Sequence, residues 1–202
     1  MSSNVIQKLR EHFERFPGIG PRQAQRFVYW LLNEELPQFV NELAGLLFEL
    51  KKGVKQCGKC FRFYTSNECR FCCDKSRDNS RLLIVEKDVD LENIEKTGVY
   101  NGRYFVLGDI IPLGQTLPKN IRLKELFNRA EQEIKRDLKE IILAFNATAE
   151  GDNTIRYLEK ILEPLAKKYS VKISRFGRGL STGTELEYID RDTLKNALES
   201  RK

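Results

Sequence analysis

The 202-residue chain has no apolar run that approaches the roughly 18 residues of a membrane-spanning helix. Its opening residues, Met1 to Asn4, are too polar to begin a signal peptide. The one histidine, His12, has no serine, cysteine or aspartate constellation of the kind that nucleophilic catalysis requires. We therefore expect a soluble, cytoplasmic protein with no membrane partner, in which His12 is a structural or surface residue.

Cysteine is absent outside residues 57–73, and within that stretch four of the five cysteines form two CxxC pairs. Eight residues separate the pairs, a spacing that suits one tetrahedral zinc ion with Zn–S bonds of about 2.3 Å. A four-sulfur shell leaves no open coordination position, so this zinc would be structural. The predicted ligands are Cys57, Cys60, Cys69 and Cys72.

Two disulfides are the alternative, disfavoured because the chain has no secretory signal and no cysteine elsewhere. Cys73 could replace its neighbour Cys72 as a ligand, but the CxxC spacing favours Cys72 and leaves Cys73 as a half-buried thiol. Gly58 should let the backbone fold around the ion. Metal binding should supply most of the folding free energy of this short segment, because it has almost no core of its own.

Apolar residues at helical spacing predict helices over residues 3–15, 21–33 and 37–52. The third should bury an apolar face and close a small helical domain; that face is Phe39, Leu43, Leu46, Leu47 and Leu50. The turn between the first two helices reads Pro-Gly-Ile-Gly-Pro and resembles the helix-hairpin-helix motif of DNA repair and replication proteins.

The hairpin turn has the residues that a phosphate contact needs. Gly18 and Gly20 allow close approach of the backbone, and the amides that follow point the positive end of the helix dipole at the phosphate. Arg22 and Arg26 lie four apart on one helix face and can reach the same DNA backbone. A net charge of +6 is consistent with such a partner but does not prove it. The alternative is a glycine-stabilised connection with two solvated arginines.

From residue 81 onward, buried strands alternate with helices, which predicts an α/β domain with a mainly parallel sheet. A polar connector over residues 75–80 precedes it. The expected strands are residues 82–86, 104–107, 140–145 and 171–176, and the expected helices are residues 91–96, 123–138, 153–168 and 191–200.

This layout resembles the Toprim domain of topoisomerases and primases, in which a glutamate and a DxD motif at strand ends hold magnesium. Glu86 matches the glutamate, but the two DxD positions read Asn146 and Thr148, so we expect no efficient nuclease or topoisomerase chemistry. The remaining carboxylates form a predicted acidic patch for a basic protein partner or, alternatively, are solvated loop residues. They are Glu86, Asp90, Glu150 and Asp152.

The order of these modules, at about 200 residues, resembles the RecR family of bacterial recombination mediators. Local matches include PGIGPRQAQR, the four cysteines, SRDNSRLLIVE, YNGRYFVLG, TAEGD and RGLSTGTELEYIDRDTL. The resemblance implies a non-enzymatic protein that forms ring-shaped homo-oligomers, commonly tetramers. It also implies that the protein binds DNA and pairs with RecO or RecF to help load RecA on single-stranded DNA.

The same resemblance assigns roles by position: DNA contact to Arg22 and Arg26, zinc to the four CxxC cysteines, and partner binding to the acidic patch. Residues 186–190 would serve oligomer contacts and not nucleotide hydrolysis, and there is no Walker A loop. Two stretches depart from the family pattern, namely residues 108–114, where Asp109 adds a carboxylate, and GLSTGTELEY near the end. These departures bear on partner contacts and on ring size.

We therefore predict a multi-module α/β protein. Its predicted parts are a helix-hairpin-helix domain over residues 1–54, a four-cysteine zinc finger over 55–78, a Toprim-like domain over 79–177 and a C-terminal oligomerisation segment with a final helix over 178–202. Two rival functions stay open at this point. One is a magnesium-dependent nuclease or primase-like enzyme that uses Glu86, Asp109, Glu150 and Asp152, and the other is a zinc-clipped protein interaction module that does not touch DNA.

Overall fold

The computed structural model describes residues 4–32, 37–114, 116–177, 179–180 and 183–199. The chain divides into two compact units, residues 1–54 and residues 55–202, which are described separately. No helix within the described ranges has the length and apolarity needed to cross a bilayer.

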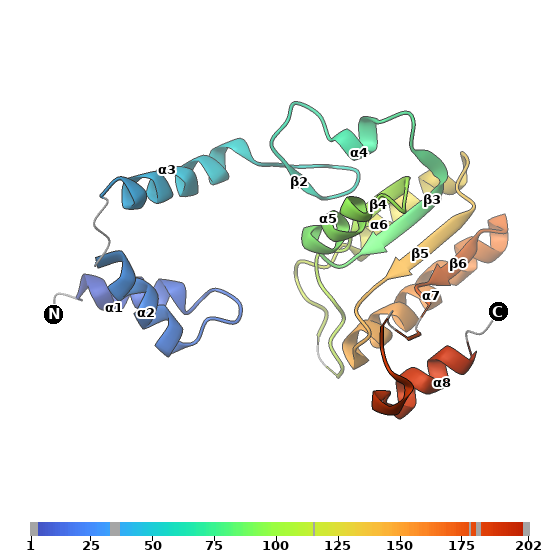
Figure 1. The fold of residues 1–202 in the computed structure, drawn as a ribbon. Coiled ribbons are helices and arrows are strands. Elements are labelled where there is room, and N and C mark those ends of the chain that lie inside the picture. The colour runs from blue at the N-terminus through green and yellow to red at the C-terminus, as the bar shows by residue number, and fades with distance from the viewer. Residues whose placement is uncertain (1–3, 33–36, 115, 178, 181–182, 200–202) are drawn as a thin grey trace. The chain divides into compact units, whose positions relative to one another are not determined.

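The first unit contains the three predicted helices (Figure 1). They are α1 (Val5–Phe13), α2 (Pro21–Leu32) and α3 (Pro37–Gly53). Asn4 caps α1, because its side chain accepts a hydrogen bond from the Ile6 amide at 3.1 Å. Helices α1 and α2 pack through Phe13 and Phe27, whose rings meet edge to face at 5.7 Å. The helical hairpin predicted from the sequence is confirmed.

Helix α3 differs from expectation in its packing. Leu46, Leu47 and Leu50, predicted to be buried, are 62%, 54% and 59% exposed, and Phe48 is 72% exposed. The apolar face therefore does not close the helical domain within one chain, and that prediction is wrong. An apolar surface of this kind on a helix commonly marks an interaction site.

The second unit is built on a four-stranded parallel sheet with the order β4-β3-β5-β6. The strands are β3 (Asp78–Val85), β4 (Gly102–Val106), β5 (Glu140–Ala144) and β6 (Lys172–Arg175). In the central strand β3, the apolar run from Leu82 to Val85 is buried on both faces. This is why it reads as a continuous hydrophobic run and not as an alternating one.

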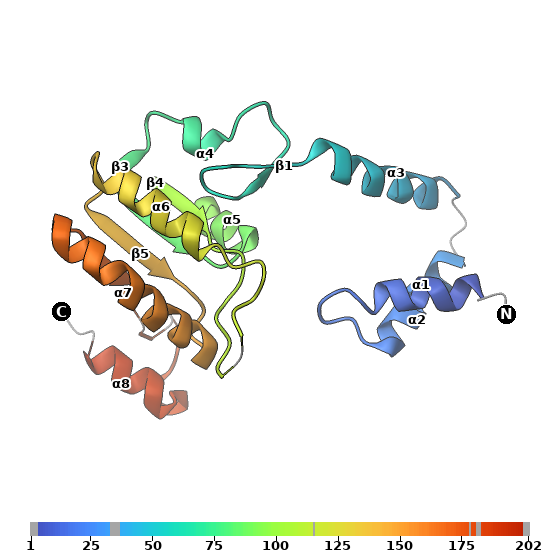
Figure 2. The ribbon, with the colours of Figure 1, turned by 180° about the vertical axis from the view of Figure 1, so that it is seen from behind.

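Helices cover both faces of the sheet. Helices α6 (Leu123–Ile134) and α7 (Ala149–Tyr169) pack on one face against Leu82 and Ile84, and Figure 2 shows them in front of the sheet. Helix α5 (Asp88–Thr97) packs on the other face against Leu83 and Val85. The four CxxC cysteines share this second core. The chain continues through a short 3-10 helix, η1 (Leu186–Tyr188), and α8 (Arg191–Glu199).

Several boundaries differ from the prediction for local reasons. Strand β3 begins at Asp78, within the predicted polar connector, because the Asp78 side chain accepts hydrogen bonds from Ser80 and pairs with Arg81. Helix α7 begins at Ala149, capped by Thr148, whose hydroxyl accepts from the Gly151 amide at 3.1 Å. Helix α6 ends at Ile134 and not at residue 138. Four short elements were not predicted: β1 (Lys55–Gln56), its antiparallel partner β2 (Phe63–Tyr64), α4 (Arg70–Cys73) and the 3-10 helix η1.

Candidate metal centre and nucleic-acid interface

The four cysteines of the two CxxC pairs converge on one point. Their sulfur atoms all lie within 4.8 Å of one another, with Cys60 and Cys69 at 3.5 Å and Cys57 and Cys72 at 3.8 Å. A tetrahedron with metal–sulfur bonds of about 2.3 Å has edges of about 3.8 Å, so the sulfurs fit one metal ion. All five cysteines are free thiols, which argues against the disulfide alternative.

The local backbone explains this convergence. The residue with a left-handed conformation is Phe61, with φ of 61°, and not Gly58, where an added Cβ would meet nothing within 4 Å. The explanation based on Gly58 is therefore wrong. Cys69 stands at the N-terminus of α4, and the Cys72 amide returns to its carbonyl at 3.0 Å. Cys72 thus faces the cluster as predicted, while Cys73 is exposed and not half-buried.

Hydrogen bonding within the cluster couples the protonation of its thiols. The hydrogen bond between Cys60 and Cys69 lowers the pKa of Cys69 and raises the pKa of Cys60, because a thiolate is stabilised by a neighbouring S–H donor. Four thiolates in this space need a cation to balance them, and Zn²⁺ is the divalent ion that four sulfur ligands in tetrahedral geometry favour.

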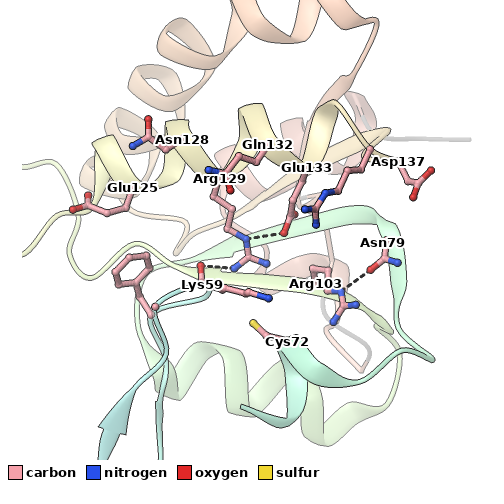
Figure 3. Close-up of a pocket in the computed structure, with 13 residues that line it drawn as sticks. Lys59, Cys72, Asn79, Arg103, Glu125, Asn128, Arg129, Gln132, Glu133 and Asp137 are labelled. Atoms are coloured by element: carbon pink, nitrogen blue, oxygen red, sulfur yellow. Dashed lines mark hydrogen bonds and ion pairs between the residues drawn. The ribbon is translucent and has the colours of Figure 1, made fainter. Parts of the chain in front are cut away.

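Arg129 of α6 ties the cysteine segment to the sheet (Figure 3). Its Nη1 donates to the carbonyl of Lys59 at 2.5 Å and to the carbonyl of Tyr104 at 3.1 Å, while its Nε pairs with Glu133 at 2.9 Å. The Lys59 carbonyl lies within the first CxxC turn, so a buried guanidinium holds that turn from outside the sulfur shell. Sequence reasoning missed Arg129, since nothing local links it to a residue 70 positions earlier.

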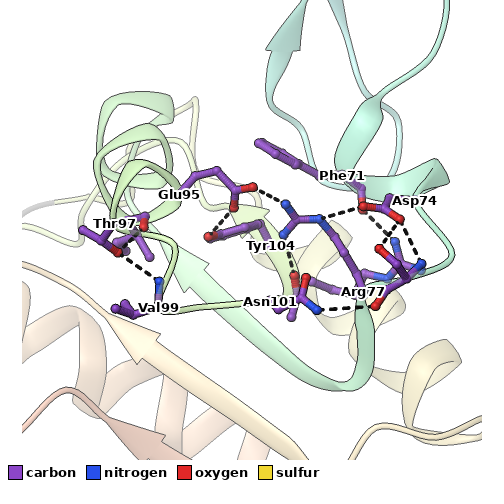
Figure 4. Close-up of polar contacts among 12 residues, drawn as sticks. Phe71, Asp74, Arg77, Glu95, Thr97, Val99, Asn101 and Tyr104 are labelled. Atoms are coloured by element: carbon purple, nitrogen blue, oxygen red, sulfur yellow. Dashed lines mark hydrogen bonds and ion pairs between the residues drawn. The ribbon is translucent and has the colours of Figure 1, made fainter.

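A second arginine network lies on the other side of the cysteine segment, around Phe71 (Figure 4). The guanidinium of Arg77 lies 4.5 Å from the centre of the Phe71 ring and also pairs with Glu95. Glu95 in turn accepts a hydrogen bond from the Tyr104 hydroxyl at 2.8 Å. Burial, together with this bond, raises the pKa of Tyr104. The cysteine segment is thus packed into the α/β unit on two sides.

The hairpin turn presents both predicted arginines to solvent. Gly18 has φ of 78°, a left-handed conformation that favours glycine, and the turn leads into the first amides of α2. Arg22 and Arg26 are exposed, one helical turn apart, opposite the buried Ala24. Among the ion pairs of the described residues, neither arginine has a carboxylate partner.

The predicted acidic residues differ widely in environment. Glu86 is only 5% exposed and pairs with Lys87, whose Nζ lies 2.6 Å from its carboxylate. Glu86 is therefore not a solvated loop residue. Asp90 accepts a hydrogen bond from the Lys87 amide at 3.0 Å and caps α5. The hydrogen bond to Glu86, followed by the charges of Glu86 and Asp109, raises the pKa of Lys87.

The other two acidic residues, Glu150 and Asp152, lie in the first turn of α7 and not in a loop. Glu150 is exposed. Within the described part of the chain, the cysteines form the one group of three or more His, Cys, Asp or Glu side chains close enough to share a metal ion. The carboxylate set of the nuclease alternative is therefore not assembled as a metal site.

Three family models match the chain. The helix-hairpin-helix of RecR matches residues 6–47, the Toprim domain matches residues 80–177, and the RecR C-terminal family matches residues 179–202. Curated relatives match over nearly the full length. Recombination protein RecR of Chloroherpeton thalassium is 42% identical, over 99% of this chain and 97% of that one. Recombination protein RecR of Bdellovibrio bacteriovorus is 37% identical, over 98% of this chain and 97% of that one. Recombination protein RecR of a Synechococcus strain is 39% identical, over 98% of this chain and 99% of that one.

Proposed function

The chain belongs to the RecR family of recombination proteins, and from that premise we propose that it is a non-enzymatic, DNA-binding recombination mediator. It acts in recombinational repair with RecO- or RecF-type partners and helps to load RecA on single-stranded DNA. One zinc ion per chain, held by Cys57, Cys60, Cys69 and Cys72, has a structural role. Each part of this proposal has support in a different region of the chain.

The exposed start of α2 carries the DNA-binding part of the proposal. The left-handed Gly18 shapes the turn that leads into the first amides of α2, and Arg22 and Arg26 stand on the same exposed face. Amides at a helix N-terminus and unpaired guanidinium groups both favour phosphate. Contacts of this kind hold DNA without reading its sequence.

The carboxyl ends of β3 and β5 support a non-enzymatic role. The positions that would carry a DxD motif are Asn146 and Thr148, which cannot supply the negative charge that magnesium needs. The remaining glutamate, Glu86, is buried and already neutralised by Lys87. At the positions of the glutamate and the DxD motif, a cation would therefore meet one carboxylate that is already paired with a lysine and two neutral side chains.

The same edge of the sheet is the proposed partner surface, although one of the four residues of the predicted acidic patch, Glu86, is buried there. Glu150 is exposed at the start of α7, where its charge can attract a basic partner, whereas Glu86 is buried. Asp90 and Asp152 complete the set. For the oligomer, a homo-oligomeric ring is supported by the exposed apolar face of α3, which another copy of the chain would cover.

The experiment compares the wild type with Arg22→Ala plus Arg26→Ala on duplex DNA across a salt series, with and without magnesium. Two phosphate contacts fewer should weaken binding to every sequence alike and reduce the slope of log K against log salt by about 1.8. Lys124→Ala plus Lys160→Ala is the matched control, since it removes two exposed charges from the second unit. That control variant should keep most of the affinity.

Two outcomes would overturn the proposal. Unchanged affinity and salt slope in the double arginine variant would remove the hairpin as the DNA-binding element. Magnesium-dependent cutting or synthesis that disappears in Glu86→Gln would make the protein an enzyme. Salt-sensitive binding that leaves the DNA intact is the expected result.

A further inference from the structure

Helix α2 has an unusual solvent face. Its exposed positions recur at helical spacing as Arg22, Gln25, Arg26, Tyr29 and Trp30, opposite the buried Ala24 and Val28. The two aromatic side chains are 47% and 53% exposed. A solvent face normally carries polar side chains, so two adjacent exposed rings beyond two arginines need an explanation.

The two rings border hollows in the surface of the helical hairpin. A hollow of about 870 Å³ is lined by Arg22, Arg26, Tyr29 and Trp30, among others. A second hollow of about 340 Å³ lies toward α1 and is lined in part by Arg10 and, again, by Tyr29. Tyr29 therefore lines both hollows, and each hollow is also lined by at least one arginine.

Trp30 packs against a neighbouring aromatic ring and is still half exposed. Its ring meets that of Phe39 edge to face at 5.3 Å and 88°, which fixes the orientation of the indole while leaving about half of it exposed. An immobilised ring loses little conformational entropy when a flat ligand stacks on it. Tyr29 and Trp30 thus provide neighbouring flat surfaces at the end of a line of positive charge.

We propose that Arg22, Arg26, Tyr29 and Trp30 form a stacking face that binds single-stranded DNA, with bases on the two rings and phosphates on the two arginines. This inference rests on the proposed DNA contact of the hairpin and specifies the form of DNA that it takes. From Arg22 to Tyr29 the helix rises about 10 Å, or about three nucleotides at the stacked spacing of about 3.4 Å.

The preference for single strands over duplex DNA follows from whether the bases are free to stack on the two rings. In a duplex each base is already stacked and paired, so the rings of Tyr29 and Trp30 gain no partner and only the arginines contribute. In a single strand the bases are free to stack on an aromatic side chain, whatever their identity. The stacking face therefore favours single strands without favouring a sequence, which agrees with the proposed role on single-stranded DNA.

A second copy of the chain is the competing occupant of this face. Two arginines without a carboxylate partner among the described residues favour a polyanion over an apolar protein surface. The apolar face of α3, with Leu46, Leu47 and Leu50 exposed, by contrast presents large apolar side chains and fits a protein partner better.

The test uses the full chain, oligothymidylate and a duplex of the same length. Trp30 is the only tryptophan in the sequence, so intrinsic fluorescence reports on this face directly. Oligothymidylate should quench it more strongly than the duplex does. Tyr29→Ala should lower affinity for oligothymidylate roughly tenfold, the effect of losing one stacked base, while changing duplex affinity less than about twofold. Tyr29→Phe, which keeps the ring, should bind like the wild type.

The outcomes distinguish failure of this inference from failure of the DNA-binding proposal on which it rests. If Arg22→Ala plus Arg26→Ala weakens binding but Tyr29→Ala leaves the single-strand to duplex ratio unchanged, the hairpin binds DNA and the stacking face is refuted. If the double arginine variant has no effect either, the DNA-binding proposal itself fails. If Tyr29→Ala reduces the oligomer mass and weakens both DNA forms equally, the face joins copies of the chain, and the inference is wrong.

Discussion

The ammonium group of Lys87 lies 2.6 Å from the carboxylate of Glu86, at the carboxyl end of the central strand β3. Glu86 is buried there, whereas the Lys87 side chain is 63% exposed. A buried carboxylate needs a positive partner, and in this chain the next residue provides it. The lysine thus balances the charge that a metal ion would otherwise balance.

Replacement of this lysine should cost stability. Lys87→Gln leaves Glu86 without its counter-charge, and because the lysine is largely exposed we expect a loss of only about 1 kcal/mol in the free energy of unfolding. A double-mutant cycle with Glu86→Gln, measured by urea unfolding, should recover most of that loss. The exposed pair Glu131 and Lys135 at 2.9 Å is the matched control and should couple more weakly, because water screens both charges. Equal coupling in both pairs would contradict the role of burial.

Loss of a cysteine ligand should release the metal. Cys60→Ser removes the most deeply buried sulfur of the cluster, so we expect zinc content to fall from about one per chain and the melting temperature to drop. Cys73→Ser removes the exposed thiol beside the cluster and should keep both zinc and stability. Zinc measured by a metallochromic assay after gel filtration distinguishes the two variants. A metal-free Cys60→Ser protein with wild-type stability would mean that the site is dispensable.

Substitution of Arg129 should weaken metal binding without touching a ligand. Arg129→Met removes the hydrogen bonds to Lys59 and Tyr104, and outer-shell changes of this type lower metal affinity by roughly 10- to 100-fold. Competition with a chelator of known affinity measures the change. Arg129→Lys should not restore it, because one ammonium group cannot reproduce a planar fork that contacts three acceptors. Arg136 is an exposed arginine that lines the same surface hollow as Arg129, so Arg136→Ala is the control and should bind zinc normally.

The start of β3 should respond to acid. The hydrogen bond from the Ser80 hydroxyl, followed by that from the Ser80 amide and the contact with Arg81, lowers the pKa of Asp78 to about 2. Because this value lies below the unfolded pKa of about 3.9, the stabilisation is present above pH 4 and is lost as pH falls toward 2. The stability difference between wild type and Asp78→Asn should therefore shrink across that range. Ser80→Ala should move the loss to higher pH, and a difference that stays constant with pH would refute the assignment.

The apolar face of α3 should govern assembly. A charge at Leu47, which is 54% exposed, would disfavour burial against another copy, so Leu47→Asp should lower the mass measured by light scattering. Val99→Asp introduces the same charge at an exposed apolar position of the second unit and should leave the mass unchanged. An unaltered mass in Leu47→Asp would place the oligomer contact elsewhere.

Local sequence patterns predicted most helices and strands, because the signals are local. The apolar run from Leu82 to Val85 and the two CxxC pairs each carry their own periodicity or spacing. The errors in the starting residues of elements arose where a polar side chain forms hydrogen bonds with neighbouring residues. Asp78 and Ser80 were predicted to lie in a polar connector, yet they hydrogen-bond to each other within strand β3. Thr148 caps helix α7, which therefore begins four residues before the helix predicted from the apolar pattern.

The parts of the candidate site that no pattern predicted depend on distant residues or on side-chain direction. The contact from Arg129 to Lys59 joins two modules, and neither segment contains a signal of it. The ion pair between Glu86 and Lys87 depends on the direction of the lysine side chain, which the adjacency of the two charges in the sequence does not specify. Exposure of the α3 face was also not predictable from the pattern, since a helix with an exposed apolar face has the same periodicity as a helix whose apolar face packs against its own chain.

The ties between the cysteine segment and the sheet also set an order of events during synthesis. The four cysteines lie within 16 consecutive residues and can gather around a metal ion as soon as they leave the ribosome. The carbonyls of Cys60 and Lys59, however, find their partners only at Val106 and Arg129. A nascent segment that has folded around an ion would therefore dock only after more than half of the chain has emerged. Refolding from denaturant should accordingly show a fast metal-dependent phase followed by a slower docking phase.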